Sequence, residues 1–568
     1  MPIIGIDLGT TNSLAAYFTS DGPKIIPNSL GEALTPSVVS VGEDGTIYVG
    51  RIAKERLLTC PENTASVFKR SMGSEKTFTL GDRVFSAEEL SSFIIKKLKE
   101  DAENFLGEEI SEAVISTPAY FNDTQRKATK AAGELAGFRV ERIISEPTAA
   151  AIAFGLHTSR DISKCLVFDL GGGTFDVSIL EFSDKVMEVR AVAGDNYLGG
   201  EDFTGVLMEM FMQEHGISPE TLTLRDFVML NKNAEDAKLE LSARKKATMS
   251  WTFDGQARSL EVTAEVFEER CKTLIARLKA PIIRAVNDAG VRLADVDSII
   301  FVGGATKMPL IQSFVSRLFK RFPVFGINPD EAVALGAAVQ AAMKERKEDI
   351  RELILTDVCP FTLGTAVSVQ QNNGFFRSGI FQPIIERNTV IPASREERFY
   401  TMAPNQTSVK VEILQGESWR AKDNVLLGEI DIPVPAGPAG QETVDVRYTY
   451  DVNGILEVNV KVTSSGESKR MIIEKNPGAV TPEQIEQRIE ELASLKLHPR
   501  DKDKNRYLLE KGERYYQTTT GFIRMRIAEE LNNFEAALDG QHSKEIEEAA
   551  ERLRSLFEDA ENEQNNGE

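Results

Sequence analysis

The alternation of apolar and polar positions along the chain changes character twice. In residues 1–349, short apolar runs alternate with amphipathic stretches of helical period, which is typical of α/β domains. In residues 358–475 the period becomes two: Val409, Val411 and Ile413 alternate with polar residues, and Asn453-Gly454 further on predicts a hairpin turn. This second region is therefore predicted to be an antiparallel β-domain.

Residues 476–568 have the pattern of charged helices. Thr481-Pro482-Glu483-Gln484 forms a capping box with proline at the first helical position, and apolar residues then follow on one helical face. The last residues, 561–568, are polar, and we expect them to be disordered. The predicted order of regions is thus α/β, all-β and all-α.

The segment 350–357 between the first two regions is predicted to be an interdomain linker, and it carries an apolar patch, Leu353-Ile354-Leu355. A linker is normally polar, so the patch needs an explanation. It is either the first strand of the next sheet or a segment that docks on the first domain in one state and is released in another.

Composition and charge narrow the class of protein. The chain has 568 residues, too many for one core, of which 42% are apolar and 27% charged. Its net charge of −21 argues against nucleic acid or a membrane as the main partner. No signal peptide or membrane-spanning run is evident, and four scattered cysteines are typical of reduced thiols, so we expect a cytoplasmic protein.

Two stretches of the α/β region, Ile3–Thr11 and Cys165–Asp176, repeat one motif: an apolar strand ends in Asp and a Gly/Thr turn follows. Glycine lets the backbone turn with its N–H groups free to face an anion. Two such turns across a cleft would hold a nucleoside triphosphate from both sides. Because carboxylates repel bare phosphate, a divalent metal with its waters must lie between them. The repeat therefore predicts a metal–nucleotide site at the junction of two duplicated lobes.

A third glycine loop, Ile299–Thr306, also follows an apolar strand. No Asp accompanies it, so it suits a nucleoside better than phosphates. A Gly-x-x-x-x-Gly-Lys-Ser/Thr motif is missing from the sequence, and a P-loop ATPase is therefore not supported. Phosphoryl transfer depends on positioning and charge neutralisation, which these loops could supply.

These motifs, in this order, resemble the DnaK-type heat-shock chaperones from residue 3 to about residue 475. The matching strings are Gly5–Ser13, Thr117–Asp123, Glu146–Ala151, Phe168–Asp176, Leu198–Phe203 and Asn328–Val333. A short first lobe and a short helical region make the chain look like the HscC-like bacterial members. The resemblance implies a two-lobed, actin-like α/β ATPase domain, a β-sandwich that binds substrate and an α-helical lid.

The resemblance also implies a function: an ATP-dependent chaperone that binds extended apolar segments of unfolded proteins, with ATP and ADP as nucleotides and Mg²⁺ as cofactor. The residues matching hydrated Mg²⁺ are Asp7, Asp169 and Asp176. The residues matching the catalytic set are Lys69 at the attacking water, Glu146, Asp169 and Thr174. The residues matching the nucleotide contacts are Gly9, Thr10, Thr11, Asn12, Gly171, Gly172, Gly173, Thr174, Gly199, Gly200, Glu235, Lys238, Ser242, Gly303, Gly304, Lys307 and Asp330.

Other matching positions concern regulation and partners. Pro118 and Arg126 match a relay from nucleotide to linker, Arg142 and Asp357 match positions of J-domain docking, and Leu353, Ile354 and Leu355 are candidates for the docking patch. The implied partners are unfolded polypeptides, a J-domain co-chaperone and a candidate nucleotide-exchange factor. The residues matching the peptide pocket are Phe399, Met402, Val409 and Val411, although the alternation alone fits an ordinary sandwich core equally well.

The chain departs from the family pattern at several positions. Leu239 and Lys307 stand where many members place arginines beside the adenine, so we expect looser nucleotide binding and faster exchange. Met402 stands where many members of the family have a smaller residue. The loop 365–378 is longer than usual and carries Phe375-Phe376, so the residues that arch over the peptide cannot be assigned there.

Two other classes of protein remain as alternatives. A small-molecule kinase of the actin-like fold would need an acidic base in the cleft and has no use for the β and α regions. A non-cycling holdase, or a cousin that acts as an exchange factor, should tolerate loss of its hydrolytic residues, yet Lys69, Glu146 and Thr174 are present.

Overall fold

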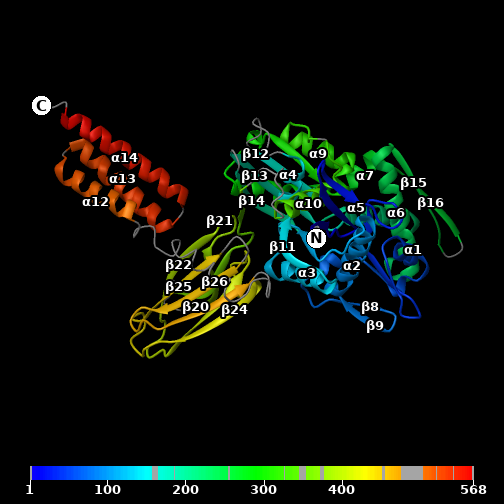
Figure 1. Ribbon diagram of the computed structural model, residues 1–568, viewed down its shortest axis with the longest axis horizontal. Helices are drawn as coiled ribbons and strands as arrows, with labels where there is room; N and C mark the ends of the chain where they lie inside the picture. Colours follow the sequence, from blue (N-terminus) through cyan, green and yellow to red (C-terminus); the bar gives the residue numbers. More distant parts are fainter. Residues whose placement is uncertain are drawn as a thin grey trace.

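The computed structural model describes residues 3–155, 164–183, 186–253, 256–324, 326–344, 354–370, 376–450, 455–474, 503–519, 521–541 and 543–565. Figure 1 shows an α/β region, a β-sandwich and a helical bundle that follow one another along the chain, in the order that the sequence pattern predicts. Among the described helices, none has the length and apolar character needed to cross a bilayer.

The first lobe of the α/β region is built on the sheet β11-β10-β1-β2-β3, with β4 beside β2. Its strands are β1 (Ile3–Asp7), β2 (Asn12–Thr19), β3 (Gly22–Ile26), β4 (Thr35–Pro36), β10 (Glu112–Thr117) and β11 (Arg139–Ser145). Strands β1, β10 and β11 are parallel, β2 is antiparallel to β1, and β3 is antiparallel to β2. The predicted apolar run of β1 is buried at Ile4 and Ile6, and Asp7 stands at its carboxyl end.

Smaller elements complete this lobe. They are β5 (Val38–Val41), β6 (Ile47–Val49), β7 (Thr64–Ser66), β8 (Thr77–Leu80), β9 (Arg83–Ser86), α1 (Arg51–Thr59), α2 (Ala87–Leu106), α3 (Asp123–Leu135) and a 3₁₀ turn at Phe68–Ser71. Capping boxes formed by Ser86 with Glu89 and by Asn122 with Gln125 start α2 and α3, because they satisfy the free amides of the first turn.

The second lobe repeats the strand arrangement of the first. Its sheet has the order β17-β12-β13-β14-β18-β21, in which β12 is parallel to β17 and antiparallel to β13. The elements are β12 (Lys164–Leu170), β13 (Phe175–Ser183), β14 (Val186–Asp195), β15 (Lys246–Phe253), β16 (Gln256–Thr263), β17 (Ser298–Val302), α5 (Gly200–His215), α6 (Leu224–Ala243), α7 (Ala264–Arg270), α8 (Lys272–Asp288) and α9 (Pro309–Phe319). Asp169 occupies the place in β12 that Asp7 has in β1.

Two helices rich in small residues, α4 (Glu146–Ala153) and α10 (Ala332–Lys344), connect the lobes. Helix α10 packs on β1 and on α4, and α4 in turn contacts β12 and β17. The approach is close enough to require glycine: a Cβ on Gly336 would lie 1.8 Å from the carbonyl oxygen of Ala149. This shared packing fixes the two sheets relative to each other and so fixes the cleft between them.

The described part of the predicted linker, with Val358, forms a strand, β18 (Ile354–Val358), at the edge of the second lobe's sheet. It pairs in parallel with β14, where Val186 faces Ile354, and antiparallel with β21 (Val390–Ile391) of the sandwich, where Asp357 faces Ile391. One sheet therefore runs from the second lobe into the sandwich. Of the predicted docking patch, Ile354 and Leu355 lie in β18, and Leu353 lies outside the described residues.

The β-sandwich consists of two four-stranded sheets, β20-β19-β23-β24 and β22-β25-β26-β27. Their strands are β19 (Leu363–Gln370), β20 (Phe376–Ile385), β22 (Ala393–Tyr400), β23 (Ser408–Gln415), β24 (Val425–Pro433), β25 (Thr443–Tyr450), β26 (Ile455–Val462) and β27 (Ser468–Glu474). The alternation is as predicted: Val444, Val446 and Tyr448 are buried between the sheets. The predicted turn at Asn453-Gly454 and residue Phe375 lie outside the described residues.

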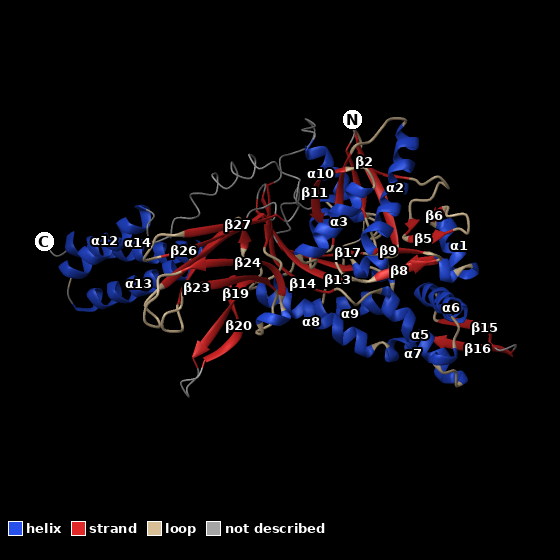
Figure 2. Cartoon of the chain, turned by 90° about the horizontal axis from the view of Figure 1, so that it is seen from below, coloured by secondary structure: helices blue, strands red, loops and turns tan. Residues whose placement is uncertain are grey.

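The C-terminal helices α12 (Asp503–Thr518), α13 (Gly521–Gly540) and α14 (Ser543–Asn565) form a bundle around Phe534, Leu553 and Phe557. Figure 2 shows this bundle at the far end of the sandwich from the α/β region. The expected disordered tail is wrong for residues 561–565, because α14 continues to Asn565. The predicted capping box at Thr481 lies outside the described residues.

Candidate active site

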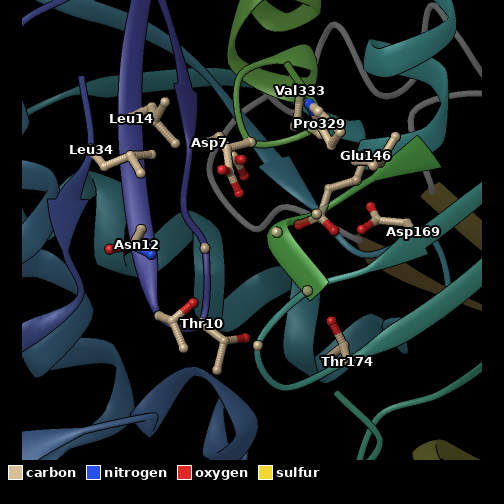
Figure 3. A pocket seen from close by; sticks show the side chains of 18 of the residues that line it. Asp7, Thr10, Asn12, Leu14, Leu34, Glu146, Asp169, Thr174, Pro329 and Val333 are labelled. Atoms are coloured by element: carbon tan, nitrogen blue, oxygen red, sulfur yellow. The ribbon is translucent and has the colours of Figure 1, made fainter. Parts of the chain in front are cut away.

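A cavity that opens to solvent, with about 540 Å³ of empty space including its mouth, lies between the two lobes where the predicted turns converge (Figure 3). The predicted residues that line it are Asp7, Gly9, Thr10, Thr11, Asn12, Lys69, Glu146, Asp169, Gly171, Gly172, Thr174, Gly303, Gly304 and Asp330. Sequence reasoning missed the apolar part of the lining, Leu14, Leu34, Val302, Pro329 and Val333, because single apolar residues carry no local signal of a pocket.

The first turn is held in shape by hydroxyl groups. The Gly9 amide donates to Ser13 Oγ at 3.2 Å, and Ser37 Oγ donates to the Gly9 carbonyl at 2.8 Å. A Cβ on Gly9 would lie 1.9 Å from the carbonyl oxygen of Asn12, so only glycine fits the turn. Next to it, Asp7 Oδ1 accepts a hydrogen bond from Ser116 Oγ at 2.8 Å. The turn is thus preorganised around Asp7.

The second turn rests on the start of α5. The amides of Gly200 and Glu201 donate to the carbonyls of Gly171 and Gly172, both at 2.9 Å. In a trans peptide the N–H points opposite to the C=O, so the next two amides of the turn, those of Gly172 and Gly173, point away from α5. Two backbone donors are therefore free to face an anion, as the sequence motif predicts.

The two turns contact each other at the wall of the cavity. A Cβ on Gly172 would lie 2.3 Å from the side chain of Thr11, and a Cβ on Gly173 would lie 2.5 Å from that of Thr10. Lys69 and Glu146 lie beside the turns as a buried ion pair, with 2.9 Å between Nζ and Oε1 and side chains 3% and 8% exposed. Figure 3 shows the carboxylates of Asp7, Glu146 and Asp169 close together, with Thr10 and Thr174 nearer the other end.

The charges of this cluster do not balance. Burial raises the pKa of Asp7 and of Asp176 to about 7, with the Glu146 carboxylate as the second cause, and burial also raises the pKa of Asp169. Burial lowers the pKa of Lys69, but the nearby carboxylates of Glu146 and Asp7 outweigh it and keep this pKa above its ordinary value. One ammonium thus faces several carboxylates, and Asp169 Oδ2 is buried with no hydrogen-bond partner among the described residues.

Without nucleotide or metal, the protein is expected to lose stability as the pH rises from about 4 to about 7. The folded-state pKa of Asp176 is about 7 and the ordinary value is 3.8, so the native state binds more protons in this window and the unfolding free energy falls with pH. Asp176→Asn should flatten this fall in thermal unfolding measured with a chelator. Asp295→Asn is the control, because the pKa of Asp295 is lowered to about 2 in the folded protein, so this carboxyl is ionised in both states above about pH 5 and adds nothing to the fall. Equal slopes in wild type and Asp176→Asn would contradict the prediction.

The third glycine loop closes another side of the cavity. Gly303 has φ +82°, a conformation that favours glycine, and a Cβ there would lie 2.4 Å from the carbonyl oxygen of Leu170. Lys307 forms an ion pair with Asp330, with 2.5 Å between Nζ and Oδ2.

Two further predicted positions lie outside the cavity lining. Asp176 lies behind the lining, where its Oδ1 accepts a hydrogen bond from the Tyr120 amide at 2.9 Å. Leu239 is largely exposed.

Glu235 and Lys238 belong to a network that includes Thr204, a residue that sequence reasoning missed. The ammonium of Lys238 contacts the Gly200 carbonyl at 3.0 Å, Thr204 Oγ1 at 2.8 Å and Glu235 Oε2 at 2.6 Å, so all three of its donors have partners. The Thr204 hydroxyl contacts Glu235 Oε2 at 2.6 Å. Ser242 Oγ donates to the Lys238 carbonyl within α6. The network ties the second turn, through Gly200, to α6.

Replacing Thr204 by valine is expected to lower the affinity for ATP about fivefold to tenfold, because it leaves part of a buried polar network unpaired. Isothermal titration of ATP into each variant measures this. Thr204→Ser keeps the hydroxyl and should retain most of the affinity. If the serine and valine variants lose the same affinity, Thr204 acts through packing and the prediction is wrong.

Arg70 also joins the lobes, and no local pattern signals it. From the first lobe, its Nε donates to the Gly173 carbonyl at 2.8 Å and its Nη2 to Asp202 Oδ2 at 2.7 Å. These partners lie 103 and 132 residues away in sequence. Asp202 Oδ2 also accepts from the Gly199 amide, so Arg70 ties the first lobe to the start of α5.

The predicted relay residues lie between this site and the sandwich. The buried guanidinium of Arg126 donates to the carbonyls of Phe121 and Ala119 and to Thr117 Oγ1, so it holds the segment that carries Pro118. Arg142 lies in β11 and Asp357 in β18. The ring of Tyr120 packs on Phe361, the first aromatic residue after β18, with 4.6 Å between ring centroids.

Of the predicted peptide-pocket residues, Val411 is buried in the sandwich core, Phe399 and Val409 pack partly buried against that core, and Met402 is partly exposed.

Comparisons with known proteins agree with this geometry. A family model described as Hsp70 protein matches residues 3–80 and 75–567. The chain is 43% identical over 490 residues to the chaperone protein DnaK of Thermotoga neapolitana and equally so to that of Thermotoga maritima, covering 83% of this chain and 80% of each relative. It is 42% identical over 489 residues to the chaperone protein DnaK of Thermosipho africanus, covering 83% and 79%.

The match spans the α/β region, the sandwich and the helical bundle. A small-molecule kinase would not need the sandwich or the bundle. The resemblance stated from the motifs is thereby confirmed. This chain belongs to the Hsp70 family and is an ATP-hydrolysing, ATP-dependent chaperone.

Proposed function

We propose that ATP binds in the cavity between the lobes, with its phosphates against the two glycine turns. The observation that carries this is that both turns line the same cavity, with the amides of Gly172 and Gly173 directed away from α5. Thr10, Thr11 and Thr174 would then contact the β- and γ-phosphates. The adenosine would lie toward Gly303 and Gly304, between α6 and the third loop. Glu235, Lys238 and Ser242 would hold it from α6, and Lys307 and Asp330 from the other side.

The cluster of Asp7, Asp169 and Asp176 fits Mg²⁺ held mainly through its waters. Hard carboxylate oxygens suit this ion, and the unpartnered Asp169 Oδ2 supplies an acceptor for a bound water. Within the described part of the chain, no three such side chains converge as direct metal ligands. When bound, Mg²⁺ would neutralise phosphate charge.

The proposed roles in ATP hydrolysis follow from where Lys69, Glu146 and Thr174 lie in the cavity. Lys69, buried and charged, would hold the attacking water near the γ-phosphate, and Glu146 would keep the ammonium in place through their 2.9 Å contact. Thr174 lines the cavity at the second turn (Figure 3), and its hydroxyl would contact the same phosphate. The carboxylates around Lys69 keep it protonated, so its charge is present throughout the physiological pH range.

Coupling to the sandwich would use the contacts that already join the regions. ATP shifts the protein toward the docked arrangement only if it binds that arrangement more tightly. The path would run from Asp176 through the Tyr120 amide and ring to Phe361, with Pro118 and Arg126 supporting the segment. Ile354 and Leu355 in β18 would form and break the pairing with β14. Arg142 and Asp357 would serve a J-domain co-chaperone.

The sandwich would bind extended segments of unfolded polypeptides at the end that carries Phe399, Met402, Val409 and Val411. Backbone hydrogen bonds to an extended chain, plus a pocket for apolar side chains, suit many unfolded sequences and no folded one. The proposed partners are therefore unfolded clients, a J-domain co-chaperone and a nucleotide-exchange factor. Since Leu239 and Lys307 replace arginines, ADP release is expected to be faster than from relatives that have both arginines.

The test is the release of a fluorescent apolar peptide from the full chain after ATP and Mg²⁺ are added, for wild type and Thr174→Ala. We expect ATP to accelerate release from both proteins, and only wild type to hydrolyse ATP at the normal rate. A rate of peptide release that does not change when ATP is added would indicate a passive holdase. Failure of wild type to bind any peptide would overturn the assignment of the sandwich.

A further inference from the structure

Strands β19 and β23 of the sandwich separate from each other partway along their length. In the pairing that the structure describes, they are joined at Leu363 with Gln415, Gly364 with Leu414 and Thr365 with Ile413. Beyond this point β19 continues to Gln370 beside β20, and β23 is paired with β24 back to Ser408. We call the space between residues 366–370 and 408–412 the fork. Figure 2 shows the β19–β20 hairpin projecting from the body of the sandwich.

Among the described residues, the fork leaves two strand edges without a ladder partner on their facing sides. Such edges can bind an extended peptide through its backbone. Apolar side chains accompany them: Val369 is 48% exposed on β19, and Val409 on β23 is only partly buried. An extended polypeptide with apolar side chains therefore matches the fork in both backbone and side-chain chemistry.

Thr365 lies at the base of the fork, on the inner face of the sheet. Directly paired residues of neighbouring strands project to the same face, and so do residues two apart in one strand. Thr365 therefore shares its face with Leu363, Val411 and Ile413, all of which belong to the sandwich core. The residues of the other face, Ala366 and Leu414, belong to a separate cluster.

The hydroxyl of Thr365 is unusual in this setting. The residue is 3% exposed, and its Oγ1 is buried with no hydrogen-bond partner among the described residues. Its core neighbours Leu363, Val411 and Ile413 have no side-chain polar atoms to offer. Gln382, its ladder partner on β20, donates its side-chain amide to the Pro383 carbonyl at 3.4 Å. A buried hydroxyl without a partner is unfavourable, and valine would fill the same space without that cost. The hydroxyl at the base of the fork is therefore available to a ligand.

We propose that a client side chain enters the fork and that the Thr365 hydroxyl hydrogen-bonds its polar tip. The favoured client segment is extended and mainly apolar, with one hydroxyl-bearing residue at the central position. This inference rests on the proposed binding of peptides by the sandwich and adds the chemistry that selects among them. A site with a buried hydrogen-bonding group discriminates against ligands that leave this group unpaired.

A double-mutant cycle tests the inference with matched shapes on both sides. Two fluorescent peptides, identical except for valine or threonine at the central position, are titrated into nucleotide-free wild type and Thr365→Val. The ratio of Kd for the valine peptide to Kd for the threonine peptide should be about threefold to tenfold higher in wild type than in the variant. Thermal unfolding should show Thr365→Val to be at least as stable as wild type.

Thr401→Val is the matched control, since Thr401 also has a buried hydroxyl with no partner among the described residues but lies outside β19 and β23, the strands that border the fork, with its backbone bonded to Glu442 and Gly440. This variant should leave the ratio of the two Kd values unchanged. An unchanged ratio in Thr365→Val, or an equal change in Thr401→Val, would overturn the role of Thr365. If wild type binds neither peptide nor the apolar peptide used above, the proposed function of the sandwich fails instead.

Discussion

Replacing Lys69 by methionine is expected to lower the rate of ATP hydrolysis at saturating ATP by about 100-fold to 1000-fold, the range found when one preorganised donor to a reacting group is removed. Methionine preserves the length of the side chain but lacks the ammonium that pairs with Glu146 at 2.9 Å. Single-turnover hydrolysis measures the chemical step. ATP should still bind, because the turns and the third loop remain intact.

Lys130 provides the matched control for this experiment. It is another buried lysine of the first lobe, lies in α3 outside the cavity lining and pairs with Glu134 at 3.3 Å. Lys130→Met removes a buried ammonium of the same kind and should leave single-turnover hydrolysis within about threefold of wild type. If Lys69→Met hydrolyses ATP as fast as Lys130→Met, Lys69 does not hold the attacking water.

Reversing the charge at Asp288 is expected to remove most of the acceleration of peptide release by ATP. Asp288, at the end of α8, accepts two hydrogen bonds from Arg387 of the sandwich, at 2.9 and 3.3 Å, and one from Asn388 at 2.9 Å. Asn388 Oδ1 accepts from the Val192 amide of β14 at 3.0 Å. The hydrogen bond that Arg387 donates to Asp288 is the largest cause that raises the pKa of Arg387 above its ordinary value. These contacts would hold the sandwich against the second lobe in the docked arrangement.

The expected size of the effect on peptide release follows from how exposed the ion pair of Arg387 and Asp288 is. The side chains of Arg387 and Asp288 are 30% and 21% exposed, so the pair contributes less than a fully buried one, and replacing it by repulsion should shift docking about tenfold. Asp288→Arg should reduce the ATP-stimulated rate of peptide release in stopped-flow fluorescence by that factor. The double variant Asp288→Arg/Arg387→Asp should recover part of it, because it restores the pair in reverse while Glu417, which Arg387 also contacts at 2.7 Å, loses this partner.

A control within the sandwich separates interdomain coupling from stability. Arg398 pairs with Asp445 through Nε at 2.6 Å and Nη2 at 3.0 Å, and both residues belong to the sandwich. Arg398→Glu breaks an ion pair of similar form and should leave the response to ATP intact. If Asp288→Arg and Arg398→Glu have equal effects on release, or if the double variant shows no recovery, the pair does not couple the regions.

The amino-acid sequence by itself determined the local elements and the chemistry they carry. The apolar runs before Asp7 and Asp169 are strands, the Gly/Thr segments after them are turns, and the period-two region is a two-sheet sandwich. These features depend on residues close together in the chain, where periodicity and glycine leave little choice. The same local signal was insufficient at residues 561–565, because a polar segment can simply extend a helix that is anchored elsewhere.

Only the tertiary structure decided which elements meet. Several contacts join segments far apart in sequence. They are the contact of Gly172 with Thr11, the hydrogen bonds between the second turn and the start of α5, the network around Thr204 and the pairing of β18 with β14. No local periodicity of apolar residues predicts such a contact, because the contact depends on how α4 and α10 pack the two sheets together. The fork and its buried Thr365 hydroxyl likewise arise where β19 and β23 stop pairing, which the alternation of either strand alone does not reveal.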